Sequence, residues 1–106
     1  MLYFAEENNN CLSLIQKTSD IPFSSNLDFS NCNLVGVLLN DLDLQNTNFE
    51  GADLTRTNFC GQELVGRVFA GANMRGADMH KANLIFSDLT DTVLIGADFR
   101  EADLSG

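Results

Sequence analysis

Two side chains in this sequence, Cys60 and His80, have the types needed for covalent or metal chemistry. A thiol beside an imidazole can act as a nucleophile with its base, or supply part of a metal site. The two residues are twenty positions apart, and His80 is the only histidine. Because both chemistries need further convergent groups and none is evident, chance explains the pair better. The sequence therefore predicts no enzyme, no catalytic residue, no metal and no cofactor.

The segment that carries these residues is one long repeat. An apolar residue returns at every fifth position from Phe29 to Leu104 without an insertion, and in units such as "GANMR" a small residue precedes it by two places. On an α-helix a five-residue step turns about 500°, so successive apolar side chains would share no face. In a strand the next small residue would point outward, so the chain must turn a corner in every unit. The pattern predicts an all-β solenoid.

The units "GADLT", "GANMR", "GADMH" and "GADFR" resemble the pentapeptide repeat, A(D/N)LXX, and the resemblance covers residues 27–106. It implies a right-handed quadrilateral β-helix with four units per coil, hence about four coils. Cys60 and His80 would then stack on neighbouring rungs. The phenylalanines at repeat centres agree with a period of twenty, because they fall into only two columns: Phe29, Phe49 and Phe69, and Phe59 with Phe99.

Residues 1–26 lack this repeat. Their apolar residues are irregularly spaced, "CLSLIQK" has the composition of a short helix, and Pro22 marks a break. The first coil of a solenoid would leave its apolar end open to solvent. Terminal caps commonly cover such ends in repeat proteins. We expect residues 1–26 to form an N-terminal capping segment, with a short helix as one option, and residues 27–106 to form the β-helix.

The net charge of −9, without a basic run, disfavours direct binding to nucleic acid or to an anionic membrane. No apolar stretch approaches the length of a membrane span. The three cysteines are odd in number and include no CxxC pair, which favours reduced thiols. Because the first residues are acidic where a signal peptide needs a basic region, we expect a cytoplasmic location.

Acidic residues are concentrated at one position of the repeat. Eight of the fifteen acids directly precede a repeat centre: Asp28, Asp43, Asp53, Glu63, Asp78, Asp88, Asp98 and Asp103. Asn occupies the same position in five other units, which favours hydrogen bonding to corner amides over selection for charge. The alternative comes from the family resemblance, since some similar proteins imitate DNA phosphates and bind DNA gyrase. This chain is shorter than those relatives and lacks their inserted loop.

Two long polar residues occupy the small inward position of the repeat, Gln62 and Arg67. The solenoid interior leaves little room there, and burying an unpartnered charge is costly. The simpler interpretation is a local bulge that turns Arg67 toward solvent, since buried arginine is rare. The sharper interpretation is a site where the wall opens for a ligand or partner.

The outer wall contains an apolar group, Val65, Ile85 and Phe86, at positions that are mostly polar elsewhere. Ordinary filling of a β-ladder explains such residues as readily as a protein-binding patch does. At the other end, the last coil would expose four repeat-centre side chains and an unpaired strand edge, which favours association. These are Leu89, Leu94, Phe99 and Leu104. We expect a homodimer through this C-terminal coil.

The function that these patterns favour is a non-catalytic structural or protein-binding module. It would present a rigid acidic β-helix to a protein partner, whose identity the sequence does not give. The alternative is a DNA-mimicking protein that binds DNA gyrase or a related topoisomerase.

Overall fold

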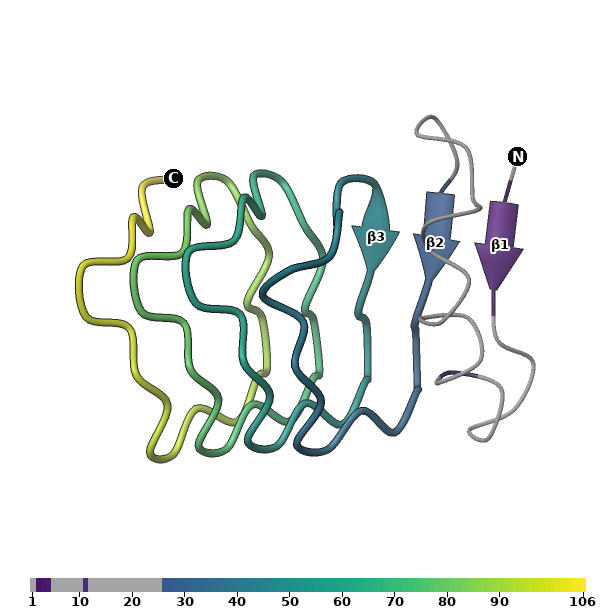
Figure 1. Ribbon diagram of the computed structural model, residues 1–106, viewed down its shortest axis with the longest axis horizontal. Helices are drawn as coiled ribbons and strands as arrows, with labels where there is room; N and C mark the ends of the chain where they lie inside the picture. The colour runs from purple at the N-terminus through teal and green to yellow at the C-terminus, as the bar shows by residue number, and fades with distance from the viewer. Residues whose placement is uncertain (1, 5–10, 12–25) are drawn as a thin grey trace.

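A computed structural model describes residues 2–4, 11 and 26–106 of the chain. Residues 27–106 wind into four stacked coils of twenty residues, which we number coil 1 (27–46), coil 2 (47–66), coil 3 (67–86) and coil 4 (87–106) (Figure 1). The three assigned strands, β1 (Leu2–Phe4), β2 (Asn26–Asp28) and β3 (Thr47–Asn48), form a parallel sheet in the order β1-β2-β3. The expected all-β solenoid of about four coils is confirmed.

Neighbouring coils are joined by parallel β-bridges between residues twenty positions apart, such as Asn33 with Asp53. The N–H of Leu34 donates to the carbonyl of Asp53 at 2.8 Å, and the N–H of Asp53 donates back to the carbonyl of Cys32 at 2.8 Å. This pattern recurs on each side of the coil and makes it a narrow parallel ladder, except between Asp43 of coil 1 and Glu63 of coil 2, where no bridge forms. Any outward residue therefore lies beside the residues twenty positions before and after it.

The core is a column of repeat-centre side chains. Phe49 stacks between Phe29 and Phe69, with ring centroids 5.7 Å and 5.2 Å apart, and Phe59 meets Phe49 edge-on at 5.4 Å. All four rings are fully buried. Offset-stacked and edge-on rings are favourable beyond the area that they bury. The column of Phe29, Phe49 and Phe69 thus becomes a continuous ring stack, and Phe59 of the other column packs edge-on against it.

Fifteen of the sixteen units contain a residue in the left-handed region, two positions after the repeat centre, and the unit of Leu39 is the exception. Glycine occupies about half of these corners, but Arg56 and Phe86 adopt φ values of 55° and 58°. The side chain of such a residue leans over the corner of the next coil. A Cβ added to Gly76 would come within 3.2 Å of Arg56 Cγ, and one added to Gly106 would collide with the ring of Phe86. Glycine twenty residues later therefore leaves room for a bulky corner.

Asp and Asn perform the same task beside these corners. The side chain of Asp53 accepts the N–H of Thr55 at 3.1 Å, and Asn58 accepts the N–H of Cys60 at 2.9 Å. The same bond forms in twelve of the sixteen units. Hydrogen bonds from Arg100 lower the pKa of Asp98 to about 2. The hydrogen-bonding role expected for these acids is present in the fold.

The N-terminal segment is attached to coil 1 at two places. Strand β1 pairs with β2, and Cys11 is buried and forms a disulfide with Cys32. The expectation of three reduced thiols is therefore wrong for this pair, because the segment brings Cys11 against an inward residue of coil 1. Only Cys60 is free among the described cysteines. The cytoplasmic location stays a prediction, and its cysteine argument now applies to Cys60 alone.

The capping role of residues 1–26 also stays a prediction. The short helix expected through "CLSLIQK" lies outside the described residues except for Cys11.

If the corner bond rather than the charge matters at these positions, Asp53→Ala should lower the free energy of unfolding by about 1 kcal/mol, because one N–H loses its acceptor. Asp53→Asn should change it far less, because the amide oxygen can accept the same N–H. Urea unfolding followed by circular dichroism measures both. Equal losses in the two variants would show that the carboxylate charge itself stabilises the corner.

Candidate functional site

Gln62 lies inside the wall and bonds to the backbone of the preceding coil. It is buried, and its Nε2 donates to the carbonyl of Leu39 at 2.6 Å and to that of Leu42 at 2.7 Å. The cost of burying the amide of Gln62 in the small inward position is thus offset by hydrogen bonds to two carbonyls of coil 1. The Nε2 group of Gln62 is therefore occupied within the protein.

Arg67 departs from the repeat in a different way. The ladder continues through it without a bulge, since its N–H donates to Leu64 at 3.1 Å and Val68 forms bridges with Asn48 and Asp88. The expected backbone bulge is wrong. Only the side chain leaves the interior, because the regular ladder fixes the backbone while the narrow core has no room for a guanidinium. Its Nε donates to the carbonyl of Val65 at 3.0 Å.

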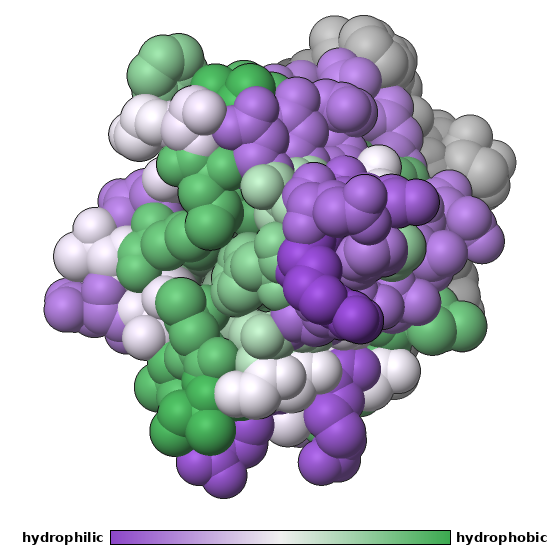
Figure 2. Space-filling model, turned by 90° about the vertical axis from the view of Figure 1, so that its left-hand side faces the viewer, coloured by the Kyte–Doolittle hydropathy of each residue, from purple (hydrophilic) through white to green (hydrophobic). Residues whose placement is uncertain are grey.

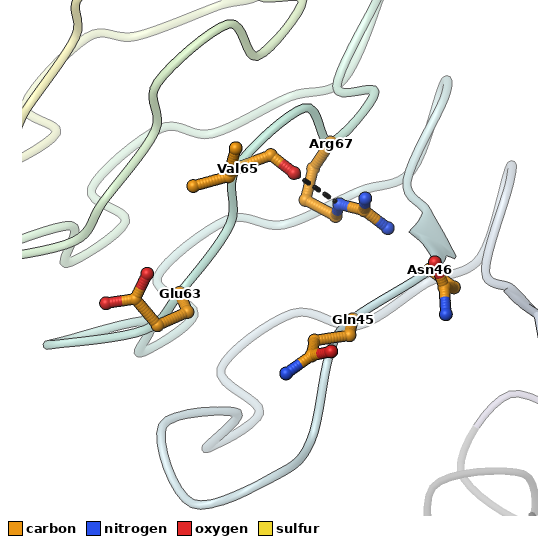
Figure 3. A pocket seen from close by; sticks show the side chains of 5 residues that line it. All are labelled: Gln45, Asn46, Glu63, Val65 and Arg67. Atoms are coloured by element: carbon orange, nitrogen blue, oxygen red, sulfur yellow. Dashed lines mark hydrogen bonds between the residues drawn. The ribbon is translucent and has the colours of Figure 1, made fainter. Parts of the chain in front are cut away.

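The displaced side chain of Arg67 lines a pocket of about 270 Å³. Its other lining residues, drawn in Figure 3, are Gln45, Asn46, Glu63 and Val65. Partial burial lowers the pKa of Arg67, yet an arginine remains charged in such a setting. We call this feature the Arg67 pocket. It corresponds in position to the opened wall that the sequence offered as an alternative.

Glu63, the acidic residue of the pocket, does not form an ion pair with Arg67. The carboxylate of Glu63 points away from Arg67 (Figure 3), and its Oε2 accepts the Nδ2 of Asn83 at 3.0 Å. Within the described part of the chain, no carboxylate lies within ion-pair distance of Arg67. The guanidinium therefore faces the pocket with one hydrogen bond and an unmatched charge.

Val65, Ile85 and Phe86, which we call the apolar strip, lie together beside this pocket. Val65 is 43% exposed and Phe86 is 71% exposed, while Ile85 is half-buried. The N–H of Gly66 donates to the carbonyl of Ile85 at 2.8 Å, which places Val65 and Ile85 on neighbouring rungs. Because Val65 also lines the pocket, strip and pocket form one continuous surface.

Other exposed apolar residues are found elsewhere on the wall. Val35 and Leu38 lie on coil 1, and Val93 and Ile95 lie on coil 4. Val93 lies in the column of Asn33, Asp53 and Asn73. An apolar residue where the other three units have Asp or Asn was therefore a feature of the sequence that could have identified it.

The C-terminal end of the stack exposes the core. Leu94 and Leu104 are 39% and 52% exposed, whereas Leu89 and Phe99 are half-buried. Figure 2 looks onto this end, where apolar surface covers one side and reaches the centre while polar surface gathers opposite. The N–H groups of all four residues have no acceptor among the described residues, although the equivalent groups in coils 1 to 3, apart from that of Leu44, are bonded to the following coil.

Cys60 and His80 are neighbours on one outer face, since the N–H of Gly61 donates to the carbonyl of His80 at 2.9 Å. The structure adds a third group, because the Nε2 of His80 lies 3.3 Å from Oε2 of Glu101. Sequence reasoning missed Glu101, which sits one residue past the position stacked on His80. Nδ1 of His80 is buried without a partner among the described residues. Three metal-binding side chains do not converge anywhere in that part of the chain.

Within residues 2–4, 11 and 26–106, no helix has the length and apolar character needed to cross a membrane. No protein of curated function matches the sequence.

Comparison with known families and structures agrees with the geometry. The profile of pentapeptide repeats matches residues 25–61, 53–85 and 68–106. A crystal structure of a pentapeptide repeat protein from the cyanobacterium Cyanothece 51142 is 30% identical with a TM-score of 0.70, over 77% of this chain and 54% of that chain. This chain thus spans about half the length of that relative.

Two further crystal structures are similar in sequence. A pentapeptide repeat protein of the Arabidopsis thaliana thylakoid lumen is 28% identical over 74% of this chain and 59% of its own, with a TM-score of 0.48. One from Nostoc PCC 7120 is 25% identical over 81% and 72%, with a TM-score of 0.45. The profile match and the likeness to the Cyanothece structure show that the chain is a right-handed quadrilateral β-helix and belongs to the pentapeptide repeat family.

Proposed function

We propose that this protein is a non-catalytic binding module that presents a rigid acidic β-helix to a protein partner through the apolar strip. The observation that carries the proposal is the conformation of Phe86, which has a φ of 58° and is 71% exposed. Left-handed backbone costs an ordinary residue about 1 kcal/mol or more, and an exposed ring recovers little of this by burial.

Packing inside the protein gives a weak reason for this phenylalanine. Its ring lies over Gly106, but most of its surface faces solvent. Strained residues that persist without a structural gain are concentrated at functional sites. Aromatic side chains are also enriched among the residues that contribute most to protein interfaces. Both arguments favour Phe86 as the centre of a contact surface, with Val65 and Ile85 beside it.

Replacing Phe86 with glycine should separate stability from binding. Phe86→Gly relieves the left-handed backbone, so we expect the free energy of unfolding to be unchanged or higher, by up to about 1 kcal/mol. We also expect loss of partner recovery from an extract of the source cells. Arg56→Gly is the matched control, because Arg56 has the same backbone strain at another corner. It should gain similar stability and retain the partner. Full recovery of the partner by Phe86→Gly would refute the strip as the contact surface.

We also propose that a second copy of the chain binds the exposed end of coil 4. Val93 and Ile95 support this, because they lie on the outer wall of that coil and continue the apolar surface sideways from Leu94. Two identical ends related by a two-fold axis close on each other without leaving another sticky end. The unbonded backbone groups at these ends are mainly N–H donors, so two identical ends offer each other few acceptors. The contact between the two copies would therefore be made by side chains.

Sedimentation equilibrium at micromolar concentration tests the dimer. We expect a dimeric mass for the native chain and a monomeric mass for Leu104→Arg, because a charge would be buried in the apolar contact. Leu38→Arg is the control, since Leu38 is 72% exposed on coil 1, away from the proposed contact. A monomeric native chain, or a dimer that Leu104→Arg leaves intact, would contradict the proposal.

DNA mimicry is the second candidate, and the net charge of −9 favours it. The corner hydrogen bonds weaken it, because they give the carboxylates a role that Asn fills equally well. A gyrase supercoiling assay separates the two functions, and we expect no inhibition. The double variant Asp78→Asn with Asp98→Asn keeps both corner acceptors on adjacent rungs. Inhibition that this variant relieves and Phe86→Gly does not would favour mimicry.

A further inference from the structure

The Arg67 pocket contains one cation, Arg67, among two neutral amides, one acid and one apolar residue. In a chain of net charge −9, the guanidinium of Arg67 is partly removed from water and has no acidic partner among the described residues. A desolvated charge without a partner costs free energy in the unbound protein. A ligand that supplies the missing negative charge would recover that cost.

The orientation of the guanidinium limits how a ligand can bind. Its Nε is occupied by the carbonyl of Val65 at 3.0 Å, which holds the plane of the group. The two terminal nitrogens make no hydrogen bond with the described residues, and in Figure 3 the group extends toward Asn46 across the pocket. Two parallel N–H groups on a fixed guanidinium match the two oxygens of a carboxylate.

The surroundings favour a carboxylate over a phosphate. Phosphate carries nearly two charges and is usually held by several donors or cations, whereas this pocket has one arginine and also contains Glu63. The side-chain amides of Gln45 and Asn46 are neutral donors and acceptors that suit peptide groups. Val65, exposed on the same surface, suits an apolar neighbour of the carboxylate.

We propose that the Arg67 pocket binds an aspartate or glutamate side chain on a peptide segment of the protein partner, with an adjacent apolar residue packed on Val65 and Ile85. The proposal rests on the proposed protein-binding function and names the chemistry of the partner. It also gives Arg67 a reason to occupy an inward position that the repeat otherwise assigns to a small residue.

Titration with two matched peptides, followed by NMR at physiological salt, tests this site without requiring the partner. The probes are N-acetyl-Asp-Leu-amide and N-acetyl-Asn-Leu-amide, which differ only in the charge of one side chain. We expect the aspartyl peptide to shift the Nε–H signal of Arg67 and the amide signal of Val65 saturably. It should bind roughly tenfold more tightly than the asparaginyl peptide, as one charge-assisted hydrogen-bonded pair allows. The Nε–H signals of Arg56 and Arg75 are internal controls and should move little.

Arg67→Ala provides the matched variant. Alanine is the residue that the repeat places in this position, so the variant should fold with an unchanged spectrum elsewhere and lose the difference between the two peptides. Equal binding of both peptides to the native chain would overturn the carboxylate site, as would equal shifts at Arg56 or a response to inorganic phosphate alone. Loss of partner recovery in Phe86→Gly would still stand in that case, so failure of this site is distinguishable from failure of the proposed function.

Discussion

The left-handed corner is the constraint on which the rest of this protein depends. A chain that turns every five residues uses a residue of positive φ in nearly every unit, and it needs a local acceptor for the backbone N–H beside the turn. Glycine meets the first need in about half of the units, and Asp or Asn meets the second in most of them. Once the corners are fixed, the parallel ladder between residues twenty positions apart follows, and with it the closed column of apolar side chains.

This arrangement separates positions that build the fold from positions that are available for function. Inward residues are small, apolar or, like Gln62, neutral and hydrogen-bonded inside the protein, so the charged side chain of Arg67 leaves the interior while its backbone stays in the ladder. Outward residues have no such limit. Phe86 and Val65 on one face, and Ile95 on the last coil, are exposed apolar residues at positions where a polar side chain would fit the fold equally well. In a repeat protein of this kind, candidate functional residues are those whose type the fold does not explain, such as exposed apolar side chains at outward positions.

Much of the fold could be predicted from the sequence, because the five-residue period is uninterrupted and its geometry excludes helices. The positions of Gln62 and Arg67 were also recognisable as departures from the pattern. The final side-chain positions of these two residues were not predictable, because they depend on which backbone carbonyls are free to accept a hydrogen bond. Two carbonyls accept hydrogen bonds from Gln62 inside the wall, and one accepts a hydrogen bond from Arg67 outside it. The Cys11–Cys32 disulfide was missed because it joins the irregular N-terminal segment to the repeat, and no period relates the two. Glu101 was missed because its contact with His80 crosses from one column to the next.

Site-specific photo-crosslinking tests the central claim most directly. A benzoylphenylalanine placed at position 86 should cross-link to a protein partner in an extract of the source cells, because this side chain is directed to solvent at the centre of the proposed contact. The same group at position 56, another left-handed corner, should give no such product. A partner captured from position 56 and not from position 86 would contradict the account and place the contact on a different face of the β-helix.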